Sequence, residues 1–253
     1  MLNYWPLIKK LTLREIKARY KQSFLGFFWI ILNPFFQMII MSFVFSKILR
    51  FGNFGVPYPL FIYAGLLPWT FMVASLQSSM GVFVSDASLI KKIYFPREVL
   101  VIATLLAKTF DFFLASIIFL LLMIFYQVPF TGFMIIFFLI FLIQFIFTYG
   151  LSLLLSALNL FYRDIQYLVN LIITLWFYLT PVVYAVEFFP ARYRIIFQLN
   201  PMSVLINAYR QVLLGGNWPN WQSLAIAALV SILIFIFCHR IFKKLERLFA
   251  DIV

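Results

Sequence analysis

The sequence has few of the side chains that usually carry out chemistry. Asp, Glu, Lys and Arg together make up 11% of the 253 residues, against about 25% in soluble domains. The single cysteine, Cys238, excludes an intrachain disulfide, and with the single histidine, His239, it provides too few ligands for a metal cage. A Ser-His-Asp set would need this same histidine, which stands at the end of an apolar run. We therefore expect neither a metal site nor a catalytic triad.

A phosphate-binding loop is also missing from the sequence. None of the nine glycines begins the pattern G-x-x-x-x-G-K-[ST], so we expect no ATP hydrolysis by that route. Of the eight acidic residues, only Asp111 lies deep in an apolar run, which leaves no buried pair of carboxylates for acid–base or divalent-metal chemistry. These absences argue against an enzyme, and we expect no cofactor on this chain.

Six long apolar runs dominate the sequence instead. Each is close to the ~20 residues that a helix needs to cross a bilayer. Apolar residues reach 65% of the chain, against about 45–50% in soluble domains. The runs are Phe24–Phe45, Leu60–Val82, Val99–Tyr126, Phe133–Leu158, Tyr167–Tyr184 and Trp221–Phe237. The predicted fold class is an all-α integral membrane protein with six transmembrane helices and no second globular domain.

The distribution of basic residues predicts the orientation in the membrane. Fourteen lie on one side of the runs: six before the first run, three between the second and third, Arg163 after the fourth and four in the tail. Five lie on the other side and Lys108 lies within a run. The positive-inside rule then places both termini in the cytoplasm. We expect anionic lipid as a partner, and not nucleic acid, because the basic residues are scattered.

The single domain, 1–253, divides into five parts on these patterns. An interfacial helix is predicted in 1–23, spans one to five in 24–180, two outer helices in 181–220, the sixth span in 221–240 and a cytoplasmic tail in 241–253. In the first part, Lys10, Arg14, Lys17 and Lys21 form a basic stripe, and Leu7, Ile8, Leu11 and Ala18 lie on a neighbouring sector. Such a helix is expected in the inner headgroup layer, either as a plain anchor or with a partner contact. Leu25-Gly26 then turns the chain into the first span.

The connection from Pro181 to Trp221 is too apolar for an ordinary outer loop. Pro190 and Pro201 divide it into two short helical pieces. We interpret them as re-entrant helices that cover a passage, because such backbone is tolerated in a membrane only when protein buries it or it lines a cavity. An amphipathic segment that lies on the outer leaflet is the alternative.

Lys108 and Asp111 are three residues apart on the third run and so share one face of a helix. Charges within a membrane are costly, and the simplest interpretation is an ion pair that faces the bundle interior. A role in proton relay is the alternative.

Aromatic residues are abundant, with 34 Phe, 6 Trp and 13 Tyr. Clusters at Phe27-Phe28-Trp29 and Trp176-Phe177-Tyr178, with Tyr184 beyond, stand near helix breaks. Aromatic faces can stack on sugar rings while a polymer slides past them. Contact with lipid or packing within the protein remains the alternative for each residue.

Four segments together resemble a known family. They are Arg14-Glu15-Ile16-Lys17-Ala18-Arg19-Tyr20-Lys21 followed by Leu25-Gly26 and Trp29, then Asn159-Leu160-Phe161-Tyr162-Arg163-Asp164-Ile165, then Thr180-Pro181-Val182-Val183-Tyr184, and Asn200-Pro201-Met202. In this order they resemble the permease subunits of ABC type-2 polysaccharide exporters, which move O-antigen, capsular polysaccharide or teichoic acid chains across the bacterial cytoplasmic membrane.

The resemblance implies partners and cytoplasmic contacts. Two permeases would pair with two separate ATPase subunits, which would bind the ATP and Mg²⁺. A coupling helix would lie in Ser85–Pro96, where the piece Ala87–Tyr94 would dock in an ATPase cleft, and Tyr162–Ile165 would make a second contact. The coupling residues are then Ala87, Ser88, Leu89, Lys91, Lys92, Tyr94, Arg163 and Asp164.

The resemblance also implies a route for a lipid-linked polysaccharide. The first and fifth spans would line a channel at the seam between two permeases, with Phe28, Trp29, Trp176, Tyr178 and Tyr184 as lining residues. Arg19, Tyr20, Leu25 and Gly26 would form the portal for the lipid-linked end, and Pro181–Gly216 would supply the outer gate helices. Two alternatives remain open: an ABC type-2 permease for a drug or a lipid, and an ion-coupled carrier that uses Lys108 and Asp111.

Overall fold

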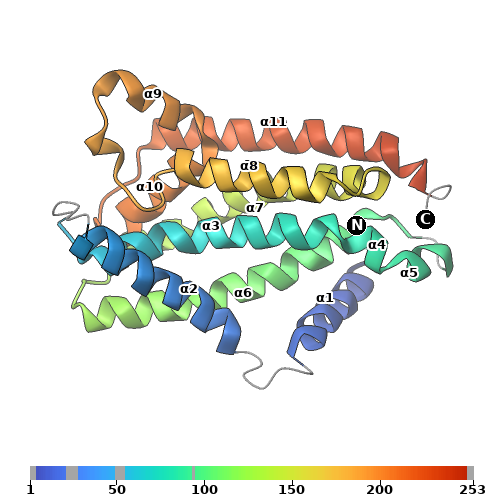
Figure 1. Cartoon of the computed structure of the whole chain (residues 1–253), viewed down its shortest axis with the longest axis horizontal. Coiled ribbons are helices and arrows are strands. Elements are labelled where there is room, and N and C mark those ends of the chain that lie inside the picture. The colour runs from blue at the N-terminus through green and yellow to red at the C-terminus, as the bar shows by residue number, and fades with distance from the viewer. Residues whose placement is uncertain (1–3, 21–27, 49–54, 93–94, 250–253) are drawn as a thin grey trace.

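The computed structural model describes residues 4–20, 28–48, 55–92 and 95–249, and the regular structure within them is helical. The long helices lie side by side (Figure 1). They are α2 (Phe28–Ser42), extended by the π-helix η2 (Phe43–Ile48), α3 (Tyr58–Met80), α6 (Glu98–Phe125), α7 (Ile136–Phe161), preceded by the 3-10 helix η3 (Gly132–Ile135), α8 (Ile165–Leu179) and α11 (Trp221–Glu246). Within the described residues, five are long and apolar enough to cross a membrane and α8 is shorter. The predicted all-α membrane fold is confirmed.

The fifth apolar run forms a shorter helix than the sequence predicts. The run extends to Tyr184, but α8 has 15 residues and ends at Leu179, which gives a length of about 22 Å. The reason is Pro181. Its ring disfavours a helical conformation in the preceding residue, and Thr180 is extended, with φ −110° and ψ 133°. The residues that follow α8 therefore have backbone carbonyls that no hydrogen bond within the helix satisfies.

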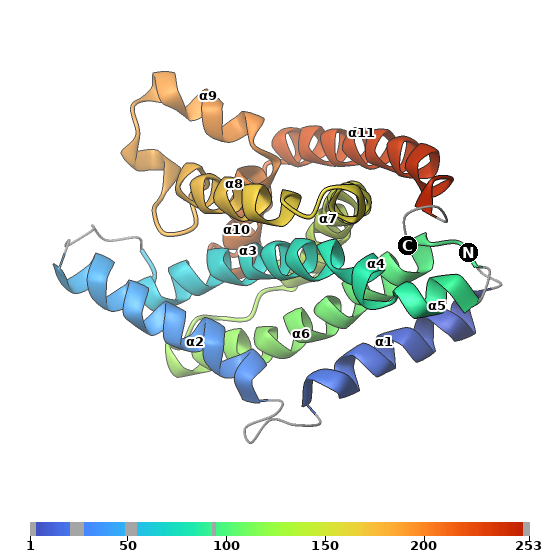
Figure 2. The ribbon, with the colours of Figure 1, turned by 45° about the vertical axis from the view of Figure 1, so that its right-hand side comes forward.

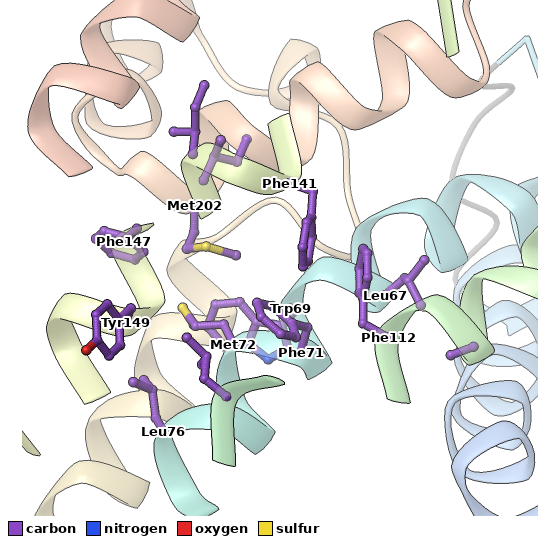
Figure 3. Close-up of a cluster of buried hydrophobic side chains, with 14 of the residues drawn as sticks. Leu67, Trp69, Phe71, Met72, Leu76, Phe112, Phe141, Phe147, Tyr149 and Met202 are labelled. Carbon is purple, nitrogen blue, oxygen red and sulfur yellow. The ribbon is translucent and has the colours of Figure 1, made fainter. Parts of the chain in front are cut away.

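Helix α3 is the centre of the bundle. It packs against α2, α6, α7 and α10 (Pro201–Leu213), and 78% of its span is buried, against 12% of the first span. Trp69, Phe71, Met72 and Leu76 of α3 lie among aromatic side chains of α6 and α7 (Figure 3). Helices α7 and α11 approach closely, since a Cβ atom on Gly150 would lie 2.7 Å from the Cα of Phe235. Small residues permit such contacts between membrane helices.

Helix α1 (Trp5–Tyr20) lies beside α6 at one end of the bundle (Figure 2). Ile8 and Leu11 are buried, and the Thr12 hydroxyl lies 2.9 Å from the Ile8 carbonyl and 3.3 Å from the Ala103 carbonyl of α6. The predicted helix is present. Part of its apolar sector packs on protein, while Ala18 is exposed.

The same end carries two short helices, α4 (Val82–Ser85) and α5 (Ala87–Lys92), and the last turns of α11. The sixth span is predicted to end at residue 240, but α11 continues to Glu246. Phe242 and Phe249 are fully buried, and both rings lie against Phe83 of α4, at centroid distances of 6.1 and 5.0 Å. Aromatic packing therefore joins the beginning of the predicted tail to the bundle.

The opposite end carries the two short helices expected between the fifth and sixth spans. They are α9 (Ala191–Leu199) and α10, and the short η4 (Val186–Phe188) precedes them (Figure 1). Pro190 and Pro201 mark their boundaries as predicted. Asn200 caps α10, because its side-chain oxygen accepts a hydrogen bond of 3.1 Å from the backbone nitrogen of Met202.

Candidate transport machinery

The end that carries α1, α4 and α5 presents an exposed basic surface. Phe83 and Ile90 are buried and fix α4 and α5 to the bundle, while Ser88, Lys91 and Lys92 are exposed and Ala87 and Leu89 are half-buried. An ion pair of 2.6 Å between Arg14 of α1 and Asp86 holds the junction of α4 and α5. We call Ser88, Lys91 and Lys92 the basic ledge. Such a surface can receive an acidic partner.

The turn between α7 and α8 lies close to this ledge. Arg163 and Asp164 are both exposed. The ring of Phe161, at the end of α7, is 5.9 Å from that of Phe249, which also contacts Phe83 of α4. One aromatic cluster thus supports both predicted coupling segments.

The faces of α2 and α8 on either side of α3 are largely uncovered. Within the described chain, α8 buries only Val169 and Ile173, and Leu171, Leu175 and Tyr178 are more than half exposed. Phe28 and Trp29, at the start of α2, are 62% and 53% exposed. A helix that buries so little of its apolar surface faces either lipid or another protein.

The backbone beyond α8 is held by Arg210 of α10, which is buried. Its guanidinium nitrogens donate hydrogen bonds to the carbonyls of Pro181 (2.6 Å), Val182 (2.5 Å), Phe61 (3.3 Å) and Tyr184 (3.4 Å). The guanidinium carbon also lies 3.7 Å from the ring centroid of Phe61. The carbonyls freed by the break at Pro181 are thus satisfied by the five donors of one arginine.

Neighbouring contacts reinforce this attachment. The hydroxyl of Tyr58 donates to the carbonyl of Val183 at 2.6 Å. Asn200 bonds the Thr180 hydroxyl at 2.9 Å and accepts from the indole of Trp176 at 3.2 Å. A Cβ atom on Gly65 would lie 2.6 Å from an Arg210 nitrogen. The segment between α8 and α10 is therefore firmly attached to the bundle, through α3 and α8.

Lys108 and Asp111 form the predicted ion pair, with 3.9 Å between the ammonium nitrogen and a carboxylate oxygen. Both side chains are mostly buried. They line a cavity of about 210 Å³ between α2, α3 and α6, together with the polar side chains of Asn33, Gln37 and Thr70. The polar lining offsets the cost of placing the pair among apolar helices.

The profile of the family described as "ABC-2 type transporter" matches residues 6–214. The chain belongs to this family. The match extends from α1 through α10 and so includes the basic ledge, the uncovered faces and the outer helices. The chain is therefore the permease component of a transporter and is not itself an enzyme.

Curated relatives of this ABC-2 permease are similar along almost its whole length. It is 32% identical over 251 residues to the O-antigen export system permease protein RfbA of Klebsiella pneumoniae, covering 98% of this chain and 95% of the relative. It is 32% identical over 256 residues to the protein of the same name from Myxococcus xanthus, covering 99% and 96%. The polysialic acid transport protein KpsM of Escherichia coli is 28% identical over 82 residues, which cover 32% of each chain.

The site residues predicted for the ABC-2 permease fall into three places. The predicted coupling residues lie at the end that carries the basic ledge: Ala87, Ser88, Leu89, Lys91, Lys92, Arg163 and Asp164. Phe28, Trp29 and Tyr178 are exposed on the uncovered faces, whereas Trp176 and Tyr184 are half-buried and hydrogen-bonded. Tyr94, Leu25, Gly26 and the side chains of Arg19 and Tyr20 lie outside the described residues. The assigned roles stay predictions.

Sequence reasoning missed two groups of polar residues. Arg210 counts only as an outer basic residue in the sequence, although an arginine inside an apolar helix that follows a proline break is a signal for a carbonyl clamp. The second group that sequence reasoning missed contains Glu98 and His239. Glu98 lies 3.1 Å from His239 and 3.2 Å from Lys243, and Lys243 lies 2.9 Å from Glu246. This cluster joins the first turn of α6 to the last turns of α11.

Proposed function

We propose that two copies of this permease form the membrane channel of an ATP-driven exporter of lipid-linked polysaccharide. The observation that carries the proposal is similarity over nearly the whole chain to relatives named as O-antigen export permeases. A relative named for polysialic acid transport supports the same class of cargo. A drug or lipid permease remains the alternative cargo class, and the experiment below separates them.

The uncovered faces of α2 and α8 support pairing with a second copy. In the described part of the chain, α3 at the centre of the bundle is largely buried, whereas two bundles related by a two-fold axis can open and close along a seam. Phe28, Trp29 and Tyr178 would then line this seam, and their rings would present broad, weakly directional surfaces to passing sugars. Because α8 has few contacts with the rest of the described chain, the seam can widen on the α8 side without unpacking the core.

The basic ledge is the proposed contact with the ATPase. When ATP closes two ATPase subunits, their clefts would push on α5, and the aromatic cluster around Phe83 would transmit the motion to α3, α7 and α11. Arg163 and Asp164 would add a second contact at the start of α8, a seam helix. In this arrangement both termini and the ledge lie in the cytoplasm, and α9 and α10 lie outside.

The direct test is deletion of this gene, with surface polysaccharide measured by antibody binding to intact cells and total polysaccharide by immunoblotting of whole-cell extracts. We expect the polysaccharide to accumulate inside the cell and to return to the surface when the gene is restored. Unchanged surface polysaccharide would contradict the proposal and favour another cargo.

Orientation is tested by adding one cysteine at a time to a background in which Cys238 is replaced by serine. We expect a membrane-impermeant maleimide to label Asn217→Cys in intact cells, and Ser88→Cys only after permeabilisation. The reverse pattern would contradict the orientation.

A further inference from the structure

A second cavity, of about 170 Å³, lies at the outer end between α9, α10 and the beginning of α11. Most of its lining is polar. Gln198 of α9 and Asn207 of α10 are exposed, and Gln211 of α10 is half-buried. The backbone nitrogen of Asn220 donates to the side-chain oxygen of Gln211 at 3.2 Å, which fixes the amide of Gln211. Apart from Arg194, the polar side chains that line the cavity are thus uncharged groups that both donate and accept hydrogen bonds.

Ser203 gives an independent indication that something binds there. This residue is one of those that line the cavity and is 2% exposed, and its hydroxyl has no hydrogen-bond partner in the described part of the chain. Ser116 and Ser231 donate to carbonyls four residues earlier in their helices. Ser85 and Ser156 donate to carbonyls three residues earlier, but Ser203, in the first turn of α10, makes neither kind of bond. A buried hydroxyl without a partner is costly, and an oxygen of a ligand would satisfy it.

The chemistry of the cavity favours a neutral ligand with several hydroxyl groups. Among the described residues that line it, Arg194 is the one that carries a charge, and the Nε of Arg194 already donates to the carbonyl of Phe189 at 3.1 Å. An anionic lipid headgroup would be expected to select a cluster of lysines and arginines. Pockets for drug-sized ligands measure about 300–1,000 Å³, so this cavity has room for about one sugar residue.

We propose that the cavity is an outer subsite that holds one sugar residue of the exported chain as the chain passes α9 and α10. The inference rests on the proposed function, which it deepens. Gln198 and Asn207 would bond hydroxyl groups at the rim, and the Ser203 hydroxyl would bond an oxygen at the base. Since Arg210 fixes α10 to α3, the subsite stands on a rigid helix. It would retain the polymer against backward movement while the transporter resets.

Photo-crosslinking in cells that carry the complete exporter tests the subsite. The photoreactive residue p-benzoylphenylalanine replaces Asn207 in one strain and Gln198 in a second. In a control strain it replaces Asn217, an exposed amide at the same end outside the cavity lining. After irradiation, the purified permease is oxidised with periodate and labelled with a hydrazide dye, which detects sugar diols. We expect a ladder of glycan-sized products at either cavity position and at least about fivefold less at Asn217.

The possible outcomes separate the two proposals. Surface polysaccharide without a ladder at either cavity position would overturn the subsite and leave the exporter intact. A single lipid-sized product would also overturn it, in favour of an outer-leaflet headgroup. An equal ladder at Asn217 would show contact that is not specific to the cavity and would overturn it as well. Polysaccharide that reaches the surface without the gene would contradict the exporter itself.

Ser203→Ala supplies a second measurement that does not depend on the bulky probe. A hydroxyl with no ligand contributes nothing, so without a subsite the change leaves export unaltered and the protein equally or more stable. With the subsite we expect the rate at which polysaccharide reaches the surface to fall about fivefold, the effect of one lost hydrogen bond, at unchanged amounts of folded permease. The control Ser231→Ala removes a hydroxyl that donates to Ala227 away from the cavity. Equal rates in Ser203→Ala and the wild type would overturn the subsite.

Discussion

Helices α3 and α8 are both strongly apolar, but they stand in opposite surroundings. Nearly every turn of α3 is covered by α2, α6, α7 and α10, whereas within the described chain α8 buries only Val169 and Ile173. Hydropathy alone does not distinguish the two, because lipid and protein are equally apolar neighbours. The difference supports the two proposed roles, with α3 as the fixed centre and α8 as a helix of the proposed seam.

The link between these two helices is the segment after Pro181, where Arg210 clamps the backbone that leaves α8 against α3. Replacing Arg210 by Met would leave the carbonyls of Pro181, Val182 and Tyr184 without this donor. Because a buried carbonyl without a partner costs about 1–3 kcal/mol, we expect the permease to lose about 3–5 kcal/mol of stability, which a large fall in melting temperature in detergent would report. Arg210→Lys should recover only part of the lost stability, since one ammonium group cannot reproduce the planar, forked set of guanidinium donors.

Arg192→Met is the matched control for the clamp. Arg192 is exposed on α9, and its guanidinium carbon lies 4.6 Å from the ring centroid of Tyr193. We expect its loss to change stability by less than about 1 kcal/mol. If the two substitutions lowered stability equally, Arg210 would not differ from an exposed arginine such as Arg192, and the clamp would be excluded.

The role of the α8 surface is tested by one pair of substitutions. Leu175 of α8 and Leu233 of α11 have the same exposure, 56%, so tryptophan at either position should alter the isolated bundle equally. If α8 faces a second copy, Leu175→Trp should reduce export about tenfold and lower the yield of dimer in crosslinking, because tight seams tolerate overpacking poorly. Leu233→Trp should do neither. Equal export by both variants would indicate that α8 faces lipid.

The sequence predicts the location of the helices better than their neighbours. The six runs, the two outer helices and the Lys108–Asp111 pair all follow from local patterns, namely run length, proline position and helical spacing. The environments of α3 and α8, the Arg210 clamp and the packing of Phe249 on Phe83 do not. They depend on which segments meet in space, and the same apolar side chain can contact lipid, the protein core or a second subunit.

The basic ledge provides a prediction of intermediate size. Replacing both Lys91 and Lys92 by Glu reverses the charge of an exposed surface without touching the buried Ile90 that anchors α5. We expect export to fall about tenfold, with less ATPase recovered on purification of the permease, and the loss to grow as salt is lowered, since exposed charges are less screened. The control reverses Lys9 and Lys10, which are exposed on α1. Unaltered ATPase recovery in the Lys91/Lys92 variant would exclude the ledge as the contact.

The smallest effect is expected in the cavity beside α3, where Lys108 and Asp111 neutralise each other. Lys108→Met combined with Asp111→Asn removes both charges while keeping similar volumes, and paired buried charges can be replaced in this way at little cost in stability. Either change alone leaves one charge in an apolar bundle and should be the more harmful. We therefore expect the double variant to export polysaccharide at close to the wild-type rate and each single variant to accumulate poorly in the membrane. An ion-coupled carrier would behave in the opposite way. Its double variant would fold and stop transporting, because the titratable groups that carry the ion would be gone.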